Sequence, residues 1–359
     1  MGVAKLRVLV VDDSAYNRQT ISEFFSGHPE FEVVGRAEDG EQGLKLTALL
    51  KPDLITLDIE MPRMDGFTFL RVLMSQMPTP VIVISSHSRK QDVFQALELG
   101  ALDFVAKPQR FLAPDLSELK NEIIRKAMAV RSLQALSFAR RSSLASNSSI
   151  KSIDKSYDQL REFEGQPLAR IIAIGASTGG PPALQSILRV LSPTIPVAIL
   201  VSQHMPEKFT KAFADRLNRT SLLRIREAEA GDVIVPGNVY ISPGGAHMEI
   251  TRGGPEPFII RLGSPTPADR YVPSIDRLFT SLAKVSGPKV VGVVLTGMGA
   301  DGAEGIRILH ASGARTIAES EDSAIVFGMP KEAIHTGAID EVLSLEAIVE
   351  RLHGLVTTS

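Results

Sequence analysis

The stretch IIAIGASTGGPP, residues 171–182, is an apolar run that ends in a turn of glycines and small hydroxyl residues. A helical pattern begins at about residue 180. An apolar run, a tight turn and a helix in this order are typical of the βα unit of an α/β protein. Such a turn can hold a phosphate on its backbone N–H groups, or it can present a serine nucleophile at the end of a strand. The remaining sequence has to distinguish these two functions.

The βα pattern recurs throughout the N-terminal part of the chain. Five apolar runs alternate there with helical stretches, and these runs are residues 7–11, 32–36, 53–58, 81–85 and 103–107. Uninterrupted apolar runs are typical of strands that are buried on both faces of a parallel sheet. We therefore expect an N-terminal flavodoxin-like α/β domain with a five-stranded parallel sheet.

A second series of apolar runs follows residue 168. They are LARIIAIG, PVAILVSQ, VVGVVLT and RTIAES, and the segment 232–262 between them is rich in strand-forming residues. The two series show no internal repeat. We therefore expect a C-terminal doubly wound, mostly parallel α/β domain with a β-hairpin.

The region between the two series differs in composition. It is rich in serine, poor in large apolar side chains and without periodicity, as in RRSSLASNSSIKSIDKS. Such a segment cannot bury enough apolar surface to offset the entropy lost on ordering. The sequence thus predicts a first domain at 1–125, a linker at 126–166 and a second domain at 167–359.

The composition excludes several classes of function. The formal net charge is −2 and there is no basic stripe, so we expect no nucleic-acid partner. The chain has no cysteine, which rules out disulfides, thiolate catalysis and cysteine-based zinc sites. No apolar stretch is long enough for a spanning helix or a signal peptide, so we expect a cytoplasmic protein without direct membrane insertion.

Polar side chains follow the strands of the first domain. Asp12 and Asp13 come after the first strand, Asp58 ends the third, Ser85 ends the fourth and Lys107 ends the fifth. In a parallel sheet the carboxyl ends of the strands share one edge, so these side chains are expected to lie together. Three carboxylates there would repel one another unless a hard cation such as Mg²⁺ lay between them. Single aspartates often only cap helices, but five suitable residues at one edge favour a site for an aspartyl phosphate.

From LVVDDS through LDIEMPRMDG to the Lys-Pro at 107–108, the first domain resembles a two-component receiver domain. The resemblance implies that Asp58 accepts a phosphoryl group from a histidine kinase. It also implies that Asp12, Asp13 and Asp58 bind Mg²⁺. In the same way, Ser85 and Lys107 would sense the phosphate.

Two further positions of the first domain are implied by the same resemblance. Phe104 matches the aromatic switch position of receivers but lacks the hydroxyl of the tyrosine often found there, so a hydrogen-bonded switch is not expected. Pro108 would follow a cis peptide bond, which only proline tolerates at low cost.

In the second domain, residues 175–179 fit the pattern G-x-S-x-G with Ser177 at its centre. A strand before it and a helix after it provide the context of a nucleophile elbow. The dinucleotide fingerprint G-x-G-x-x-G fails, because its second glycine would be Ser177 and no acidic residue follows near 195–200. The phosphate-loop alternative is weakened and the serine nucleophile is favoured.

A nucleophilic serine needs a base and a group that orients the base. Of the seven histidines, only His204 directly follows an apolar strand, VAILVSQ, and that strand is expected to lie parallel to the one before Ser177. Asp301 lies in the glycine-rich loop LTGMGADG after another buried strand, and it is the preferred orienting residue. Three rival carboxylates lack such a strand: Asp215, Asp232 and Asp276. The backbone N–H groups near Thr178 and Met298 are candidate donors to an oxyanion.

Together, IGASTGG, SQHMP and LTGMGADGAEG resemble the catalytic domain of the chemotaxis methylesterase family, whose members also act as glutamine deamidases. The resemblance implies Ser177 as nucleophile, His204 as general base and Asp301 as its orienting residue. It further implies γ-glutamyl methyl esters on methyl-accepting chemoreceptors as substrate, with recruitment to receptor arrays. No cofactor is expected for ester hydrolysis. Val272 departs from the family pattern, which usually has a basic residue before the following Pro-Ser.

The resemblance to a receiver also predicts regulation. We expect the unphosphorylated receiver to cover the Ser177 edge and phosphorylation of Asp58 to release it. Two alternatives stay open on the sequence alone: a receiver fused to a nucleotide-binding domain with GASTGG as its phosphate loop, and a scaffold with a degenerate active site.

Overall fold

The computed structural model describes residues 4–86, 90–107, 113–133, 163, 165–192, 194–252, 257–284 and 289–357. The chain divides into two compact units, Met1–Ser149 and Ile150–Ser359, which are considered separately below. Most of the predicted linker lies outside the described residues, and so does Pro108. None of the described helices has the length and apolar character that crossing a lipid bilayer requires.

The first unit has the predicted five-stranded sheet, with every neighbouring pair parallel. In spatial order its strands are β2 (Phe31–Ala37), β1 (Leu6–Val11), β3 (Leu54–Leu57), β4 (Val81–Ser86) and β5 (Asp103–Lys107). Its helices are α1 (Ala15–Ser26), α2 (Gly40–Leu50), α3 (Gly66–Gln76), α4 (Lys90–Glu98) and α5 (Ala113–Met128), with a short 3₁₀ helix η1 (Ala129–Ser132). This strand order confirms the flavodoxin-like fold.

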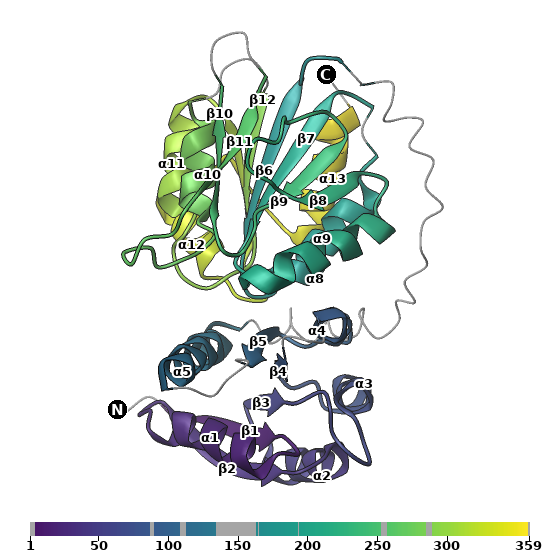
Figure 1. Cartoon of the computed structure of the whole chain (residues 1–359), viewed down its shortest axis with the longest axis vertical. Helices are drawn as coiled ribbons and strands as arrows, with labels where there is room; N and C mark the ends of the chain where they lie inside the picture. The colour runs from purple at the N-terminus through teal and green to yellow at the C-terminus, as the bar shows by residue number, and fades with distance from the viewer. Residues whose placement is uncertain are drawn as a thin grey trace. The chain divides into compact units, whose positions relative to one another are not determined.

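Short polar residues cap three of the helices of this unit. Ser14, Asp39 and Asp65 each accept a hydrogen bond from the backbone N–H three residues further on, which satisfies one of the free donors of the first helical turn. Apolar residues of β1 and β4 form one buried cluster with residues of α1 and α5. These two helices lie on the same face of the sheet (Figure 1). The caps and this packing fix where the carboxyl ends of the strands lie.

The second unit contains a seven-stranded sheet in which every neighbouring pair is parallel. In spatial order its strands are β14 (Glu341–Leu343), β13 (Arg315–Glu319), β12 (Lys289–Val294), β6 (Arg170–Ala176), β7 (Val197–Gln203), β9 (Asn238–Ile241) and β8 (Arg224–Glu227). The hairpin that the sequence predicts is formed by β10 (His247–Thr251) and β11 (Ile259–Gly263). The expectation of a doubly wound α/β domain with a β-hairpin is thus confirmed.

Helices cover both faces of this sheet (Figure 1). One group is α8 (Gly180–Val190), α9 (Glu207–Thr220) and α13 (Leu345–Thr357), and the other is α10 (Ile275–Leu282), α11 (Ala303–Ala311) and α12 (Met329–His335). The second group and the hairpin share one continuous apolar core with β6 and β7. The hairpin is therefore packed against α10.

The winding of the second sheet creates a switch point between β6 and β12. From β6 the chain proceeds outward through β7 to β8 and β9, then returns to β12 on the other side of β6 and continues to β13 and β14. The loops that follow β6 and β12 therefore diverge, and ligands of open α/β sheets bind in the crevice between such loops.

Candidate active site

Ser177 follows β6 directly and lies at the switch point. Its backbone N–H donates to the carbonyl oxygen of Thr296 in the loop after β12, at 3.0 Å. On the other side, β6 and β7 pair in register up to Ala176 and Gln203, and the His204 N–H donates to the Ala176 carbonyl at 3.0 Å. Ser177 and His204 are therefore neighbours at the carboxyl ends of adjacent strands, as the sequence predicts.

The imidazole of His204 is paired with the carboxylate of Asp301. His204 Nε2 lies 2.7 Å from Asp301 Oδ2, and both side chains are buried. Because an ionised carboxylate only accepts hydrogen bonds, the proton of the neutral ring lies on Nε2. Nδ1 is also buried and has no hydrogen-bond partner among the described residues. The pair thus leaves the Nδ1 lone pair of His204 available as a base.

Four donors hold the Asp301 carboxylate in place. Besides His204, the Ser274 hydroxyl donates to Oδ1 at 3.1 Å, the Ile275 N–H donates to Oδ2 at 2.8 Å, and the Asp276 N–H donates to Oδ1 at 3.0 Å. Burial alone would raise the pKa of Asp301, but the bonds from His204 and from the two backbone amides hold the pKa below its usual value. The N-terminus of α10 therefore keeps this carboxylate ionised.

Asp276, one of the rival carboxylates, has a different partner set. Its Oδ1 accepts hydrogen bonds from the N–H groups of Gly302 at 2.9 Å and Gly305 at 2.6 Å, at the start of α11. Burial raises the pKa of Asp276 to about 6, and the nearby charge of Asp301 acts in the same direction. Asp276 thus fixes the loop that carries Asp301, and it is Asp301 that contacts His204.

The first unit brings together the three carboxylates that the sequence singles out. One oxygen each of Asp12, Asp13 and Asp58 lies within 4.8 Å of the others. The Lys107 ammonium donates to Asp12 Oδ2 at 3.0 Å and also to Asp58. Burial raises the pKa of Asp12 to about 6, against the lowering effect of Lys107. The charges of Asp58 and Asp12 outweigh burial and raise the pKa of Lys107.

Ser85 and Phe104 occupy the neighbouring strands of the same sheet. Ser85 is buried near the end of β4, opposite Ala106 of β5. The Phe104 ring is buried as well, and Lys126 Nζ from α5 lies 4.9 Å from its centre. The same ammonium bonds the Phe104 carbonyl and, at 2.9 Å, the Asp103 carboxylate. Phe104 is thus linked to α5 through a buried cation rather than through a phenolic hydroxyl.

Comparison with known proteins identifies both units. A family model described as CheB methylesterase matches residues 172–352, and one described as response regulator receiver domain matches residues 8–116. The chain is 48% identical to protein-glutamate methylesterase/protein-glutamine glutaminase 1 of Myxococcus xanthus, over 98% of this chain and 97% of the relative. The chain belongs to the CheB methylesterase family.

Two further proteins agree with this membership. Protein-glutamate methylesterase/protein-glutamine glutaminase 3 of Geobacter sulfurreducens is also 48% identical, over 95% of each chain. The crystal structure of the Thermotoga maritima CheB methylesterase catalytic domain is matched over its whole length by 53% of this chain, with a TM-score of 0.50 and 38% identity. The methylesterase domain and the receiver domain are therefore both present.

The sequence gives no sign of several residues that shape the methylesterase site. The Tyr271 ring stacks on the His204 imidazole, with ring centres 4.7 Å apart and an angle of 4° between the planes. A side chain at Gly299 would collide with the Tyr271 hydroxyl, and one at Gly297 would approach the Ser177 Cβ to 2.7 Å. The stretch RYVPSIDRLF could have indicated Ser274 as a helix N-cap, but nothing local connects it with Asp301.

The two candidate oxyanion donors lie on either side of the switch point. Thr178 is buried after β6, and its carbonyl accepts a hydrogen bond from Thr296 Oγ1 at 3.0 Å. Met298 lies in the loop after β12, next to Gly297, whose carbonyl accepts from the N–H groups of Gly328 at 3.1 Å and Met329 at 2.8 Å. These bonds fix the two loops, and the role of the Thr178 and Met298 N–H groups stays a prediction.

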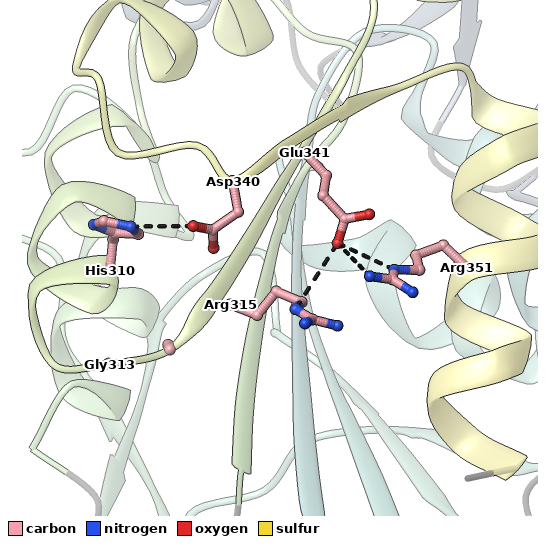
Figure 2. A pocket seen from close by; sticks show the side chains of 7 residues that line it. His310, Gly313, Arg315, Asp340, Glu341 and Arg351 are labelled. Carbon is pink, nitrogen blue, oxygen red and sulfur yellow. Dashed lines mark hydrogen bonds and ion pairs between the residues drawn. The ribbon is translucent and has the colours of Figure 1, made fainter.

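A polar pocket of about 570 Å³ lies elsewhere in this domain (Figure 2). Arg315 and Glu341 line it, and they are the first residues of β13 and β14. It therefore opens at the amino ends of the strands, on the opposite edge of the sheet from Ser177. Its charges are matched internally, since Glu341 bonds Arg351 at 2.8 Å and Asp340 lies 3.2 Å from His310.

Proposed function

We propose that this protein is a phosphorylation-regulated serine hydrolase of chemoreceptors. In this proposal the methylesterase domain hydrolyses the γ-methyl esters of receptor glutamates and deamidates receptor glutamines. The observation that carries the proposal is the buried His204–Asp301 pair, at 2.7 Å, next to Ser177 at the switch point. The names of the full-length relatives support the substrate class.

In the first step, Ser177 Oγ attacks the ester carbonyl while His204 Nδ1 accepts the hydroxyl proton. Nε2 keeps its own proton and its bond to Asp301, so the imidazolium that forms faces an ionised carboxylate. The N–H groups of Thr178 and Met298 would donate to the oxygen that becomes negative in the tetrahedral intermediate. The ionised state of Asp301 matters at this step because a protonated carboxyl could not stabilise the new charge.

Collapse of the intermediate releases the leaving group and forms a glutamyl ester of Ser177. The Nδ1 proton of His204 passes to the leaving oxygen and gives methanol, or to the leaving nitrogen of a glutamine and gives ammonia. A water molecule then attacks the acyl-enzyme, again with His204 as base, and restores the hydroxyl of Ser177. The Tyr271 ring shields one face of the imidazole and thereby limits competing contacts with bulk water.

The receiver domain supplies the regulation. Asp58 would accept a phosphoryl group from a chemotaxis histidine kinase, with Asp12, Asp13 and Asp58 as the oxygen ligands of Mg²⁺. The donor set fits this ion, because the three carboxylates converge and one of them already has a raised pKa. Bound Mg²⁺ would neutralise charge on the phosphoryl group. We propose that the unphosphorylated receiver inhibits ester hydrolysis and that phosphorylation of Asp58 relieves the inhibition.

Methanol release from methylated receptor membranes tests the proposed activity directly. Ser177→Ala should lower the rate by about 10⁶-fold, because no other group replaces the nucleophile. Unchanged thermal unfolding of the variant is the control for folding. A wild-type protein that releases no methanol, or a variant that releases it at the wild-type rate, would refute the proposal. Binding of NAD or ATP at GASTGG would instead favour a nucleotide-binding domain.

A further inference from the structure

A second histidine lies behind the His204–Asp301 pair. His247 is the first residue of β10, its side chain is 0% exposed, and both its hydrogen-bond partner and its nearest carboxylate lie outside the His204–Asp301 pair. Its Nδ1 accepts a hydrogen bond from the backbone N–H of Ser274 at 3.1 Å. Its Nε2 lies 3.3 Å from Asp269 Oδ2, close to that carboxylate but not aligned for a hydrogen bond.

The residue held by His247 is the one that leads to the active site. Ser274 is the N-cap of α10, and its hydroxyl donates to Asp301 Oδ1 at 3.1 Å. The next two backbone N–H groups, those of Ile275 and Asp276, also donate to Asp301. Three of the four donors to Asp301 therefore belong to residues 274–276. The position of the carboxylate against His204 depends on where this short segment lies.

The hydrogen bond to Ser274 also fixes the protonation of His247. A ring nitrogen that accepts a backbone N–H carries no proton, so the neutral ring has its proton on Nε2. That nitrogen lies 3.3 Å from Asp269 Oδ2, and the Asp269 carboxylate is itself held by the N–H and the hydroxyl of Thr266 at 2.7 and 2.8 Å. The hairpin thus presents a fixed acceptor to the peptide that precedes the first turn of α10.

We propose that His247 is a positioning residue for the catalytic pair and acts on His204 through Ser274 and Asp301. The proposal rests on the proposed function, because it assigns His247 a part in the same hydrolysis. His247 does not touch the reacting atoms. Its contribution is to keep the N-terminus of α10 where Ser274, Ile275 and Asp276 can aim Asp301 at His204 Nε2.

If His247 only helped to hold the hairpin against α10, loss of another tie between the hairpin and this helix should lower kcat by the same amount. Two other hydrogen bonds tie the hairpin to α10: Arg277 Nε donates to Glu249 Oε1 at 2.7 Å, and the Ile250 N–H donates to Ser281 Oγ at 2.9 Å, near the other end of the helix. Ser281→Ala removes the second of these ties and leaves Ser274 untouched. It is therefore a matched control, since it weakens docking of the hairpin on α10 without disturbing the Asp301 donors.

The test uses full-length protein and separates kcat from KM. His247→Leu keeps a similar volume and removes the acceptor, and kcat should fall by roughly 10- to 100-fold because small misplacements of catalytic groups have effects of this size. KM should change by less than about twofold, since His247 does not contact the substrate. His247→Asn places a carbonyl oxygen near the former Nδ1, so it should recover most of the lost kcat. Ser281→Ala should keep kcat within about twofold of wild type.

A double-mutant cycle tests the route through Asp301. If His247 acts through that carboxylate, adding His247→Leu to Asp301→Asn should cost less than about threefold in kcat, far below its effect in the wild-type background.

The downfield NMR resonance of the His204 Nε2 proton should also move in His247→Leu and not in Ser281→Ala. Equal kcat losses in His247→Leu and Ser281→Ala, or full additivity in the cycle, would overturn the positioning role. An inactive wild type would instead count against the proposed function.

Discussion

Both sheets carry polar residues beside a switch point, but the two edges balance their charge in different ways. In the receiver, Asp12 and Asp58 follow the adjacent strands β1 and β3, and a single flexible side chain, Lys107, bonds both carboxylates. In the methylesterase domain, Asp301 is surrounded by four donors, two of them backbone amides of α10. One edge relies on a side-chain cation, and the other relies largely on backbone N–H donors.

This difference means that the receiver site changes when a ligand binds, whereas the His204–Asp301 pair of the methylesterase domain is already arranged before a substrate binds. Three carboxylates converge at the receiver edge, and the only cations that the structure places against these aspartates, among the described residues, are Lys107 and the Arg18 guanidinium on the Asp12 and Asp13 carbonyls. Excess negative charge is left, so this edge gains most when a cation and a phosphoryl group are added. The Asp301 carboxylate is already satisfied, so its pair with His204 needs no reorganisation when the imidazolium forms. The comparison leads to four predictions, in order of decreasing effect.

The first prediction removes the proposed base, His204, from the methylesterase domain. In His204→Gln the side-chain amide can still donate to Asp301, but the Nδ1 lone pair is lost. Ester hydrolysis should fall by about 10⁶-fold while the thermal unfolding temperature stays close to that of wild type. Single-turnover methanol release measures the rate. A loss of less than about 100-fold would mean that another group accepts the Ser177 proton.

The second prediction disturbs the donors around Asp301. In Asp301→Asn the amide NH₂ meets other donors, so the His204 ring loses its orientation and activity should fall by about 10⁴-fold. Stability should fall as well. Because the pKa of Asp301 lies below its usual value of 3.8, the stability it contributes is present above that pH and is lost as the pH falls through the lower, folded-state pKa. The stability gap between wild type and variant should therefore close in strong acid.

The third prediction concerns phosphorylation of the receiver. A small-molecule acyl phosphate with Mg²⁺ should increase methanol release by the full-length protein by roughly 5- to 150-fold, the range of ordinary allosteric coupling. Asp58→Asn should abolish this response and leave the basal rate unchanged. The isolated segment 165–359 should be at least as fast as the activated full-length protein. Truncation that leaves the rate unchanged or lowers it would contradict inhibition by the receiver.

The fourth prediction isolates the cost of the buried Asp12 charge in the receiver. Burial raises the pKa of Asp12 from 3.8 to about 6, so between these values the folded state binds more protons and stability falls as the pH rises. Asp12→Asn should therefore stabilise the receiver at pH 8 without Mg²⁺, on the order of 1 kcal/mol. The gap in stability should open between about pH 4 and pH 6, the two proteins should converge below about pH 4, and Mg²⁺ should narrow the gap at pH 8. Denaturant unfolding of the receiver measures this, and a variant less stable than wild type at pH 8 would contradict it.

Much of both edges can be predicted from the sequence because strand ends are local features. An apolar run that stops at Asp12, Asp58 or Ser177 marks its own carboxyl end, and parallel strands bring such ends to one edge. The position of His204 follows from the same reasoning, whereas its pairing with Asp301, in the loop after β12, is implied by the resemblance to the methylesterase family. Which nitrogen of His204 faces Asp301 is not encoded locally, because it depends on the packing of α10.

The residues that the sequence missed make contacts across larger distances along the chain. Tyr271, Ser274 and His247 reach the site only because the hairpin docks on α10 and α10 docks on the sheet. The neighbourhood of β6 and β12 has the same origin, since more than one hundred residues separate the two strands in the chain. Local patterns contain no information on such docking, so these features become visible only in three dimensions.

The winding of the second sheet also explains why the proposed catalytic side chains occur in the order Ser177, His204, Asp301. The first two stand after strands formed in succession, and the third stands after the strand to which the chain returns late. A protein that visited the same three strand positions in another succession would encode the same spatial arrangement with its residues permuted. Searches for related hydrolases should therefore compare the strand positions of the three side chains in the sheet rather than their order along the polypeptide.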